Sequence, residues 1–557
     1  MAERADRSGI GQPAMRWWGW GEAGHPAALP AHALDFLRES VGVAPSPRPP
    51  VALDRVRLDP PGLSEPVLAE LRQILGAEGV RDGHEQRVLH AAGKGYTDLV
   101  RLRAGEPEGA PDAVLYPAGH DQVRAVLELC ARCSIAVVPF GGGTSVVGGV
   151  APLRGEHGGV VALDMGRMGA LLALDHESAT VTVQAGMRAP TLERQLAASG
   201  LTLGHFPQSF EYVSLGGCAA TRSAGQASTG YGAIEKMVLG LRLAAPAGDI
   251  ALPAVPASAA GPGLRQLLVG SEGVLGVISE LSLRVRPAPR ERIYEGLFFE
   301  DLAAGLQALR TLAREHVLPD VTRLSDEQET RMSLALAGDG GAKGRLGRAY
   351  LGLRGYGAGC LAIFGFEGSE RDVAHRRARA LELARGCGAL KVGRSPGEAW
   401  LHGRFAAPYL RDELLGRGVM VETLETATQW SKVHALHRDV AHAIAAALEG
   451  WGTPGLVMCH VSHVYETGAS LYFTFIARQR EGEEIAQWQS VKEAAAGAIL
   501  DAGATITHHH AIGRDHVPWM QREVGAVGVR ALRALKAELD PAGIMNPGKL
   551  LPVSSRG

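Results

Sequence analysis

The chain has 557 residues, of which 46 % are hydrophobic and 21 % are charged, and its net charge is −2. That length is ample for several domains with buried cores, and the near-neutral charge excludes both a basic nucleic-acid-binding protein and an acidic disordered chain. No apolar run reaches the roughly 18 residues that a membrane-spanning helix needs. Since the first residues also lack a basic-then-apolar secretion signal, we expect a cytoplasmic protein.

Residues 1–109 predict an N-terminal arm followed by a helical region. Residues 1–60 are irregular and rich in Pro and Trp, whereas 64–105 are mainly helical in pattern. Trp17, Trp18 and Trp20 favour an arm that wraps on the body of the protein and frays at its start. Anchoring of these tryptophans at a membrane interface is the alternative.

Residues 110–290 predict an α+β domain that ends near the prolines at 287 and 289. We expect helices at 120–133 and 190–199, and strands at 113–116, 135–139, 159–164, 170–175, 179–185, 238–245 and 277–286. Cys130 and Cys133 lie in the first of these helices with no second pair nearby, so we expect free thiols.

Residues 291–505 predict a second domain in which helices back an antiparallel sheet. We expect helices at 303–315, 371–387 and 429–449, and strands at 294–299, 360–366, 456–464 and 470–476. The segment 334–358 is rich in Gly and basic residues, which favours a mobile loop.

A glycine-rich loop follows the strand at 135–139 and reads Pro139-Phe140-Gly141-Gly142-Gly143-Thr144-Ser145. Its glycines permit positive φ angles and close approach of a ligand, and consecutive N–H groups can form a nest for a diphosphate. The spacing matches neither the Walker loop nor the G-x-G-x-x-G pattern. Taken alone, such a loop is more often a tight turn.

Two further motifs change that interpretation. Residues 270–278 read Gly-Ser-Glu-Gly-Val-Leu-Gly-Val-Ile, and residues 540–550 contain Asn-Pro-Gly-Lys-Leu. The three motifs together resemble the vanillyl-alcohol-oxidase/p-cresol-methylhydroxylase family of FAD enzymes. The resemblance implies an α+β fold with a two-part FAD-binding domain, formed by 110–290 and a returning C-terminal segment, 506–557. An antiparallel-sheet cap domain, 291–505, lies between the two parts.

The same resemblance implies which residues bind FAD. Some members of the family attach FAD through a His of the glycine loop, but Thr144 stands at that position, which predicts non-covalent FAD. The implied FAD-binding residues are Pro139, Phe140, Gly141, Gly142, Gly143, Thr144, Ser145, Pro207, Gln208, Ser209, Phe210, Glu211, Tyr212, Val213, Ala220, Thr221, Arg222, Ser223, Gly270, Ser271, Glu272, Gly273, Val274, Leu275, Gly276 and Val277.

Additional segments narrow the resemblance to the alkyldihydroxyacetone-phosphate synthase subfamily, namely 17–21, 204–212, 409–412, 471–473 and 508–513. This subfamily exchanges the acyl chain of 1-acyl-dihydroxyacetone phosphate for a fatty alcohol, without net redox change, and forms an ether-lipid precursor. Ala511 and the Asn-Pro-Gly-Lys tail depart from the subfamily pattern. An FAD-dependent oxidase or dehydrogenase of a hydroxy acid or alcohol is therefore the alternative.

The resemblance also implies catalytic and substrate-binding residues. Tyr472 is the expected proton shuttle, and His508, His509 and His510 are expected in acid–base catalysis or anion binding. Arg411 and Arg323 are the expected substrate-binding residues. A phenol with a pKa of ~10 needs neighbouring cations to act as a base. Without the resemblance, Tyr472 also fits a packed strand residue, and the three histidines fit a polar loop. The arginines then fit surface residues, with Asp326 as a partner for Arg323.

No metal site is predicted. In an extended segment His508 and His510 would point to one side and His509 to the other, which is a poor arrangement for a single ion. His460 and His463 lie in a strand-like context, which also disfavours a shared metal. The expected partners are small-molecule lipid substrates and no nucleic acid. The resemblance suggests a homodimer, and lipid substrates are consistent with peripheral contact with a membrane.

Overall fold

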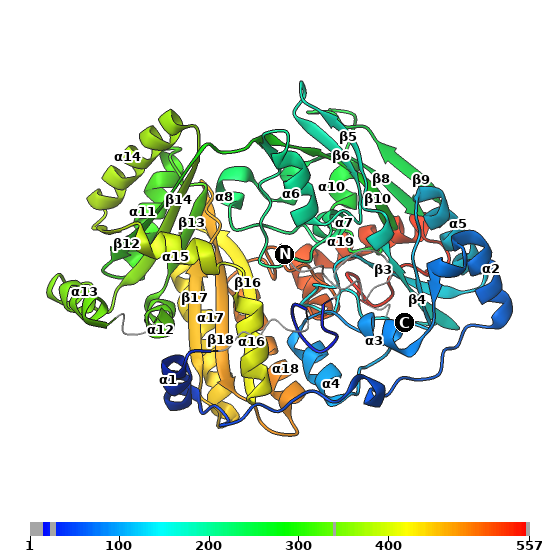
Figure 1. Cartoon of the computed structure of the whole chain (residues 1–557), viewed down its shortest axis with the longest axis horizontal. Coiled ribbons are helices and arrows are strands. Elements are labelled where there is room, and N and C mark those ends of the chain that lie inside the picture. The colour runs from blue at the N-terminus through cyan, green and yellow to red at the C-terminus, as the bar shows by residue number, and fades with distance from the viewer. Residues whose placement is uncertain (1–14, 23–28, 338–340, 553–557) are drawn as a thin grey trace.

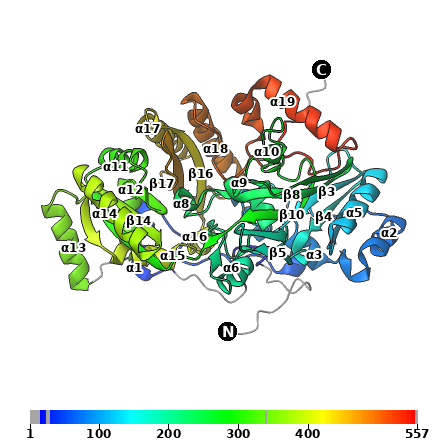
Figure 2. The same ribbon diagram turned by 90° about the horizontal axis from the view of Figure 1, so that it is seen from above.

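The computed structural model describes residues 15–22, 29–337 and 341–552, and it has two lobes (Figures 1 and 2). One lobe is built on two small sheets and carries the N-terminal helices α2 (Glu65–Leu75), α3 (His84–Leu89) and α4 (Tyr96–Ala104). The other lobe is built on one seven-stranded sheet. Helix α1 (Ala31–Val41) lies in the segment expected to be irregular, and its buried Leu37 and Val41 pack against the second lobe.

The first small sheet has the strand order β1-β2-β4-β3 and is parallel except at its β1 edge. Its strands are β1 (Val80–Arg81), β2 (Ala113–Leu115), β3 (Ile135–Phe140) and β4 (Gly159–Asp164). Helix α5 (His120–Arg132) packs on this sheet through an apolar face that includes Val123 and Leu127. Cys130 and Cys133 are free thiols, as the sequence predicts.

The second small sheet is antiparallel, with the order β5-β6-β10-β8-β9. Its strands are β5 (Leu171–Asp175), β6 (Thr180–Gln184), β8 (Val238–Ala245), β9 (Gly248–Leu252) and β10 (Val277–Arg284). Helices α6 (Ala189–Ala197) and α7 (Leu215–Ala220) cover one face of it. The short connecting elements are β7 (Leu201–Thr202), α8 (Ser228–Tyr231), α9 (Ile234–Met237), α10 (Leu264–Leu268) and β11 (Arg286–Pro287).

The large antiparallel sheet has the order β15-β12-β14-β13-β17-β18-β16. Its strands are β12 (Glu291–Phe299), β13 (Val321–Ser325), β14 (Cys360–Gly368), β15 (Leu390–Gly393), β16 (Val419–Gln429), β17 (Leu456–Val461) and β18 (Gly468–Arg478). Alternate phenylalanines, Phe364 with Phe366 and Phe473 with Phe475, are fully buried under the helices that back the sheet. Those helices are α11 (Leu302–Arg314), α14 (Glu370–Gly386), α17 (Val433–Gly450) and α18 (Glu484–Asp501).

The expectation of a loop over 334–358 is wrong. Helix α12 (Glu327–Ala337) ends inside that segment, and α13 (Gly341–Leu353) follows and projects from the end of the lobe (Figure 1). Two further helices, α15 (Ser395–Gly403) and α16 (Ala407–Gly416), connect β15 to β16.

The C-terminal segment returns to the first lobe. Helix α19 (Met520–Leu539) is kinked at Gly525, and the residues after it lie beside β3, where the N–H of Val137 donates to Ile544 at 2.8 Å. The N–H of Asn546 donates back to Val137 at 2.9 Å. Residues 544–546, near the end of the chain, therefore lie beside the strand that leads into the glycine-rich loop.

Candidate active site

The glycine loop has the backbone that a diphosphate requires. Within the described residues, the N–H groups of Gly142, Gly143, Thr144 and Ser145 have no protein acceptor. A Cβ at Gly142 would lie 2.1 Å from the carbonyl oxygen of Tyr212, and Gly143 has a φ of +65°, so both positions require glycine. Four consecutive unpaired N–H groups form a nest of the kind that binds phosphate oxygens.

The three motifs that are separate in the sequence meet at this loop. A Cβ at Gly273 would lie 2.8 Å from Pro139, so the second motif packs directly against the first. The Asn546 amide donates to the carbonyl oxygens of Gly149 at 3.1 Å and Glu272 at 2.7 Å. Ser271 Oγ and Asn546 Oδ1 are buried and have no partner among the described residues, so both can bond to a bound cofactor. These residues fit FAD.

Several of the residues expected at FAD hold other protein segments with their side chains. Arg222 Nε donates to Val269 O at 2.9 Å, and both carboxylate oxygens of Glu272 accept N–H bonds from Ile512 and Gly513. Burial is the main cause that raises the pKa of Glu272 to about 7. The Glu272 side chain therefore ties the histidine segment to the first lobe.

Residues 207–213 lie where the two lobes meet. The Gln208 amide donates to Arg404 O at 2.9 Å, and the Tyr409 hydroxyl donates to Glu211 at 3.1 Å. The rings of Phe210 and Phe405 are stacked with centroids 5.4 Å apart. This loop thus links the glycine loop to α16.

The three histidines converge on one buried carboxylate. Glu425 of β16 accepts backbone N–H bonds from His508, from His509 at 2.9 Å and from His510 at 2.6 Å. Thr507 Oγ1 donates to the same carboxylate at 2.7 Å. The expectation that the histidines alternate between two sides is wrong, because three consecutive N–H bonds to one carboxylate curl the backbone. The ring centroids of neighbouring histidines are 5.2 Å and 4.9 Å apart.

Tyr472 lies within this cluster. In the sheet, Tyr472 of β18 lies opposite Glu425 in β16 on one side and opposite His460 in β17 on the other. Its ring stacks on His460 at 4.8 Å and lies 5.5 Å from His510 and 6.0 Å from His509. The expected proton shuttle and the expected acid–base histidines therefore share one site.

Arg323 is held beside the cluster by Glu329, a carboxylate that the sequence analysis did not identify. Arg323 contacts His460 Nε2 at 3.0 Å and donates to Glu329 at 2.6 Å, and Glu329 lies 3.1 Å from His460 Nδ1. Asp326, the partner expected for Arg323, instead pairs with His437 at 3.1 Å. Burial opposes ionisation of Glu329, but Arg323 and His460 outweigh it and lower the pKa to about 2.

Burial keeps the imidazoles of the cluster neutral near pH 7. It is the main cause that lowers the pKa of His509 to about 3, and it also lowers those of His508 and His510. Burial is likewise the main cause that raises the pKa of Tyr472 to about 12. For Glu425, burial is outweighed by the charge that the three imidazoles carry once protonated and by the N–H donors, which together hold its pKa well below the ordinary value. The site thus offers neutral imidazole bases and a protonated phenol.

One further grouping has the spacing of metal ligands. Single ring nitrogens of His463, His508 and His509 all lie within 4.8 Å of one another. His463 Nδ1 has no partner among the described residues, whereas His508 Nε2 bonds the Tyr465 hydroxyl at 2.6 Å. The convergence of the histidines therefore removes the geometric reason given above against a shared ion.

Arg411 belongs to a second group of charges, beside the glycine loop. Its guanidinium donates to the carbonyl oxygen of Lys94 at 2.7 Å and to Asp412 at 3.0 Å. The N–H of Lys94 in turn donates to Ser145 O at 2.7 Å. The structure thus places Arg411 next to the end of the diphosphate nest, and Arg323 next to Tyr472.

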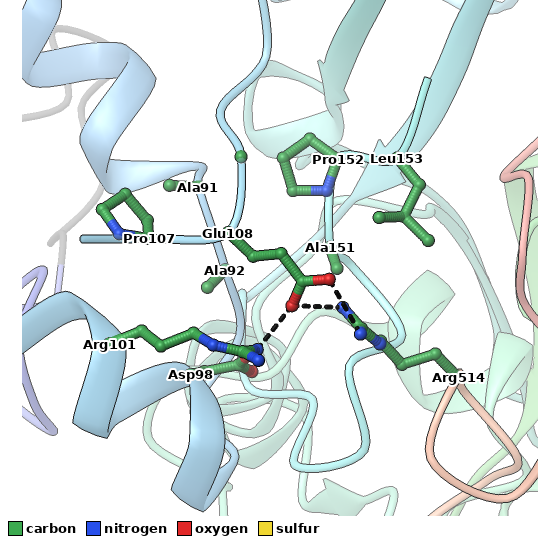
Figure 3. Close-up of a pocket in the computed structure, with 11 residues that line it drawn as sticks. Ala91, Ala92, Asp98, Arg101, Pro107, Glu108, Ala151, Pro152, Leu153 and Arg514 are labelled. Carbon is green, nitrogen blue, oxygen red and sulfur yellow. Dashed lines mark hydrogen bonds and ion pairs between the residues drawn. The ribbon is translucent and has the colours of Figure 1, made fainter. Parts of the chain in front are cut away.

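A separate pocket lies between α4 and the segment that follows Gly149 (Figure 3). Arg101 and Arg514 reach into it, and both pair with Glu108. No residue that the sequence predicts for FAD or substrate lines this pocket.

Comparison with known proteins agrees with this geometry. Residues 111–251 match the family model described as "FAD binding domain", and residues 288–550 match "FAD linked oxidases, C-terminal domain". An alkyldihydroxyacetonephosphate synthase of Trypanosoma brucei brucei is 34 % identical, over 97 % of this chain and 92 % of that protein. The chain belongs to the alkyldihydroxyacetonephosphate synthase family.

Two more relatives support this assignment. The synthase of Dictyostelium discoideum is 33 % identical over 90 % of this chain and 84 % of its own length. A solved structure of an alkyldihydroxyacetonephosphate synthase superimposes with a TM-score of 0.84 at 28 % identity, covering 99 % of this chain and 100 % of that one. The predicted family, the predicted fold class and FAD as cofactor are confirmed.

Proposed function

We propose that this protein exchanges the acyl chain of 1-acyl-dihydroxyacetone phosphate for a fatty alcohol and so forms the ether bond of an ether-lipid precursor. The observation that carries the proposal is the cluster of neutral imidazoles around Glu425, packed against Tyr472 in a chain of the alkyldihydroxyacetonephosphate synthase family. Such a site can move protons without a net redox change.

The cofactor and this chain's residues have different tasks. When bound, FAD supplies an electrophilic ring that takes up and returns the electron pair of the exchange. The nest at Gly142–Ser145 holds its diphosphate, and the motifs at 270–277 and Asn546 enclose it. Non-covalent binding follows from Thr144 in place of a histidine.

The proton at substrate C1 passes to a neutral imidazole. His509 and His510 face Tyr472 and are unprotonated near pH 7, because burial lowers their pKa values. Tyr472 keeps its proton, since its pKa is raised to about 12, and it acts as a donor. The role of first base thus moves from Tyr472 to the histidines, and Tyr472 donates its proton to the leaving carboxylate and recovers one from the entering alcohol.

Two arginines hold the anionic parts of the substrate. Arg411 uses three of its five N–H groups on Asp412 and Lys94, which leaves two for a phosphate or carboxylate. Arg323 is fixed by Glu329 beside Tyr472, where it stabilises negative charge near the reacting carbon.

The test is a single anaerobic incubation. Purified protein with bound FAD receives palmitoyl-dihydroxyacetone phosphate and labelled hexadecanol, without an electron acceptor. Labelled alkyl-dihydroxyacetone phosphate, formed over many turnovers, is the expected product. If no ether forms, and a hydroxy acid or alcohol instead bleaches a flavin that oxygen restores, the protein is an oxidoreductase.

We also propose peripheral contact with membranes, through α13. Leu346, Tyr350 and Leu353 share one face of this helix at spacings of four and three residues, and Leu346 and Leu353 are 74 % and 88 % exposed. Arg345 and Arg354 flank them, which suits an anionic lipid surface. Among the described residues, no helix is both long and apolar enough to cross a membrane.

Flotation with anionic vesicles tests this contact. Leu346→Asp with Leu353→Asp should abolish co-flotation, whereas Leu172→Asp, at an exposed leucine of β5, should not. Equal flotation of all three proteins would contradict the role of α13. Family membership further supports a homodimer, for which sedimentation equilibrium should give twice the chain mass.

A further inference from the structure

A short N-terminal segment, Met15–Glu22, closes on itself and lies against the substrate-binding region; we call it the strap. The N–H of Arg16 donates to Gly21 O at 2.8 Å, and Arg16 Nε donates to Trp20 O at 2.9 Å. The Arg16 guanidinium also lies over the Trp18 ring at 4.4 Å. These contacts give the strap one defined shape.

The strap bridges the two lobes through Trp20. This residue is 2 % exposed, and its ring packs edge-on against Tyr212 of the loop that faces the diphosphate nest, with centroids 5.4 Å apart. Its backbone N–H donates to the carboxylate of Asp412 in α16. A Cβ at Gly19 would lie 2.4 Å from Asp412 Oδ2, and one at Gly21 would lie 2.4 Å from Tyr409. Both glycines are therefore needed for this approach.

Asp412 connects the strap to Arg411. Its Oδ2 accepts the bond from Trp20, while its Oδ1 accepts Arg411 Nη2 at 3.0 Å and Nε at 3.2 Å. The buried Lys94 makes a second connection, since its Nζ donates to Arg16 O at 2.8 Å and its carbonyl oxygen accepts from Arg411 at 2.7 Å. The Arg411 guanidinium is thus bonded to Asp412 and to Lys94, and the strap contacts both of these residues.

The charges of this group suit an anionic ligand. Arg16, Lys94 and Arg411 face the carboxylates of Asp412 and Asp98, which leaves an excess of positive charge. Asp98 is engaged by the N–H of Gly95 at 3.3 Å, so it does not compete for Arg411.

We propose that the strap is a positioning device for substrate binding, in which Trp20 acts through Asp412 to orient Arg411 toward the anionic group of the substrate. The inference rests on the proposed function only in the identity of that substrate. Without the strap, Asp412 loses its N–H donor and α16 keeps only its direct contact with the loop 207–213, through Tyr409 and Glu211. The Arg411 side chain then gains orientations that do not bind the substrate.

Hydrogen exchange of the FAD-bound protein tests the strap independently of activity. Trp20→Ala removes the ring that packs on Tyr212 and keeps the strap in place, so it should speed exchange of the α16 amides (407–416) roughly tenfold. Trp451→Ala, at a half-buried tryptophan that follows α17, is the matched control and should leave α16 unchanged. Unchanged exchange of α16 in Trp20→Ala would overturn the proposal.

Steady-state kinetics then distinguish a loss of Arg411 positioning from general damage to the fold. Trp20→Ala should raise the KM for acyl-dihydroxyacetone phosphate roughly tenfold with a smaller effect on kcat, and Trp20→Phe should restore most of it. In the Arg411→Met variant, adding Trp20→Ala should raise the KM little further, because both changes act through the Arg411 guanidinium. Fully additive effects would contradict the proposal.

A second variant and a readout that does not need activity separate failure of the strap proposal from failure of the proposed function. If Trp20→Ala does not fold with FAD, Asp412→Asn replaces it, with the same expected exchange and KM shift. If the unmodified protein forms no ether product, the proposed function fails, while exchange of α16 still decides whether the strap orders that helix.

Discussion

Tyr472 has a protonation state that its surroundings impose. It is surrounded by His460, His509 and His510, all neutral near pH 7 because burial lowers their pKa values, and by Glu425, whose charge opposes ionisation of a phenol. Arg323 is close, but Glu329 balances its charge. A tyrosine in this setting keeps its proton near pH 7, so the proposed role of Tyr472 depends on its hydroxyl group as a proton donor.

Removal of that hydroxyl should abolish turnover and leave the cofactor site intact. We expect Tyr472→Phe to lower kcat at least 100-fold, the usual contribution of a positioned proton donor, with an unchanged flavin spectrum. Tyr294→Phe is the matched control, since Tyr294 is a buried tyrosine whose hydroxyl bonds Glu367 at 2.6 Å, outside the cluster. Full activity in Tyr472→Phe would show that Tyr472 is a packing residue.

At the scale of the element, strand β16 carries the carboxylate that shapes the histidine segment. Glu425 accepts the N–H groups of three consecutive residues, so the segment 508–510 cannot extend and its rings converge. Glu422 lies three residues earlier on the strand, is also buried, and accepts Trp488 Nε1 and the N–H of Thr423 instead. The two glutamates therefore serve different structures.

Glu425→Gln should disturb the histidines selectively. An amide keeps the shape of the carboxylate but loses its charge and one acceptor, so we expect a loss of about 1–3 kcal/mol in the free energy of unfolding and loss of turnover. The histidine ring resonances, observed by NMR, should shift. Glu422→Gln should be equally destabilising yet leave those resonances in place. Identical spectra for Glu425→Gln and the unmodified protein would contradict the assigned role of Glu425.

The sequence predicted the regular elements more reliably than the functional ones. The apolar periodicity of 120–133 and 135–139 identified α5 and β3 because both are buried by the pattern that periodicity measures. Strand β16 was not predicted, since its buried positions include Glu422 and Glu425, which satisfy their charge through partners distant in sequence. Helix α13 was expected to be a loop because its glycines and exposed leucines mask a helical pattern.

Prediction of the candidate site from the sequence was limited in the same way. Family motifs placed Tyr472, the histidines and the glycine loop, but Glu329, Glu425 and Lys94 carry no local signal. Their roles depend on contacts across 80 residues or more for Glu425 and across more than 300 for Lys94 and Arg411.

At the scale of the whole molecule, the buried imidazoles couple folding to pH. The pKa of His509 is about 3 in the folded protein and 6.5 as an unperturbed residue, and burial lowers those of its neighbours as well. Between these values the unfolded chain binds more protons, so stability falls as pH falls from about 6.5 toward 3.

Protonation of His509 therefore opposes folding in acid, whereas Glu272, whose pKa is raised to about 7, contributes in the opposite direction over the same pH range. At pH 5, His509 alone should cost about 2 kcal/mol of the free energy of unfolding relative to pH 7. In urea midpoints measured from pH 7 to 5, His509→Gln should gain stability relative to the unmodified protein as pH falls, because only the unmodified protein carries this cost. A variant with the same slope as the unmodified protein would show that His509 is protonated in the folded state.

We expect the cofactor to join segments that lie far apart in the sequence. The glycine loop after β3, the motif before β10 and Asn546 near the end of the chain contact one another, and Ser271 Oγ and Asn546 Oδ1 have no partner among the described residues. A ligand that binds these three segments in the folded state and not in the unfolded chain stabilises the whole molecule by mass action. The flavin is thus expected to act as a structural link between the chain's middle and its end.

Because Thr144 cannot bond to the flavin, that link should be reversible. Acid precipitation should release all yellow colour into the supernatant, and the apoprotein should melt at a lower temperature than the FAD-bound protein. Added FAD should restore the melting temperature in a concentration-dependent way, with a gain of about 2.7 kcal/mol at 100 times the Kd. Thr144→Ser, which keeps a side-chain hydroxyl, should behave identically. Colour that stays in the pellet after acid treatment would mean that another residue holds the flavin covalently.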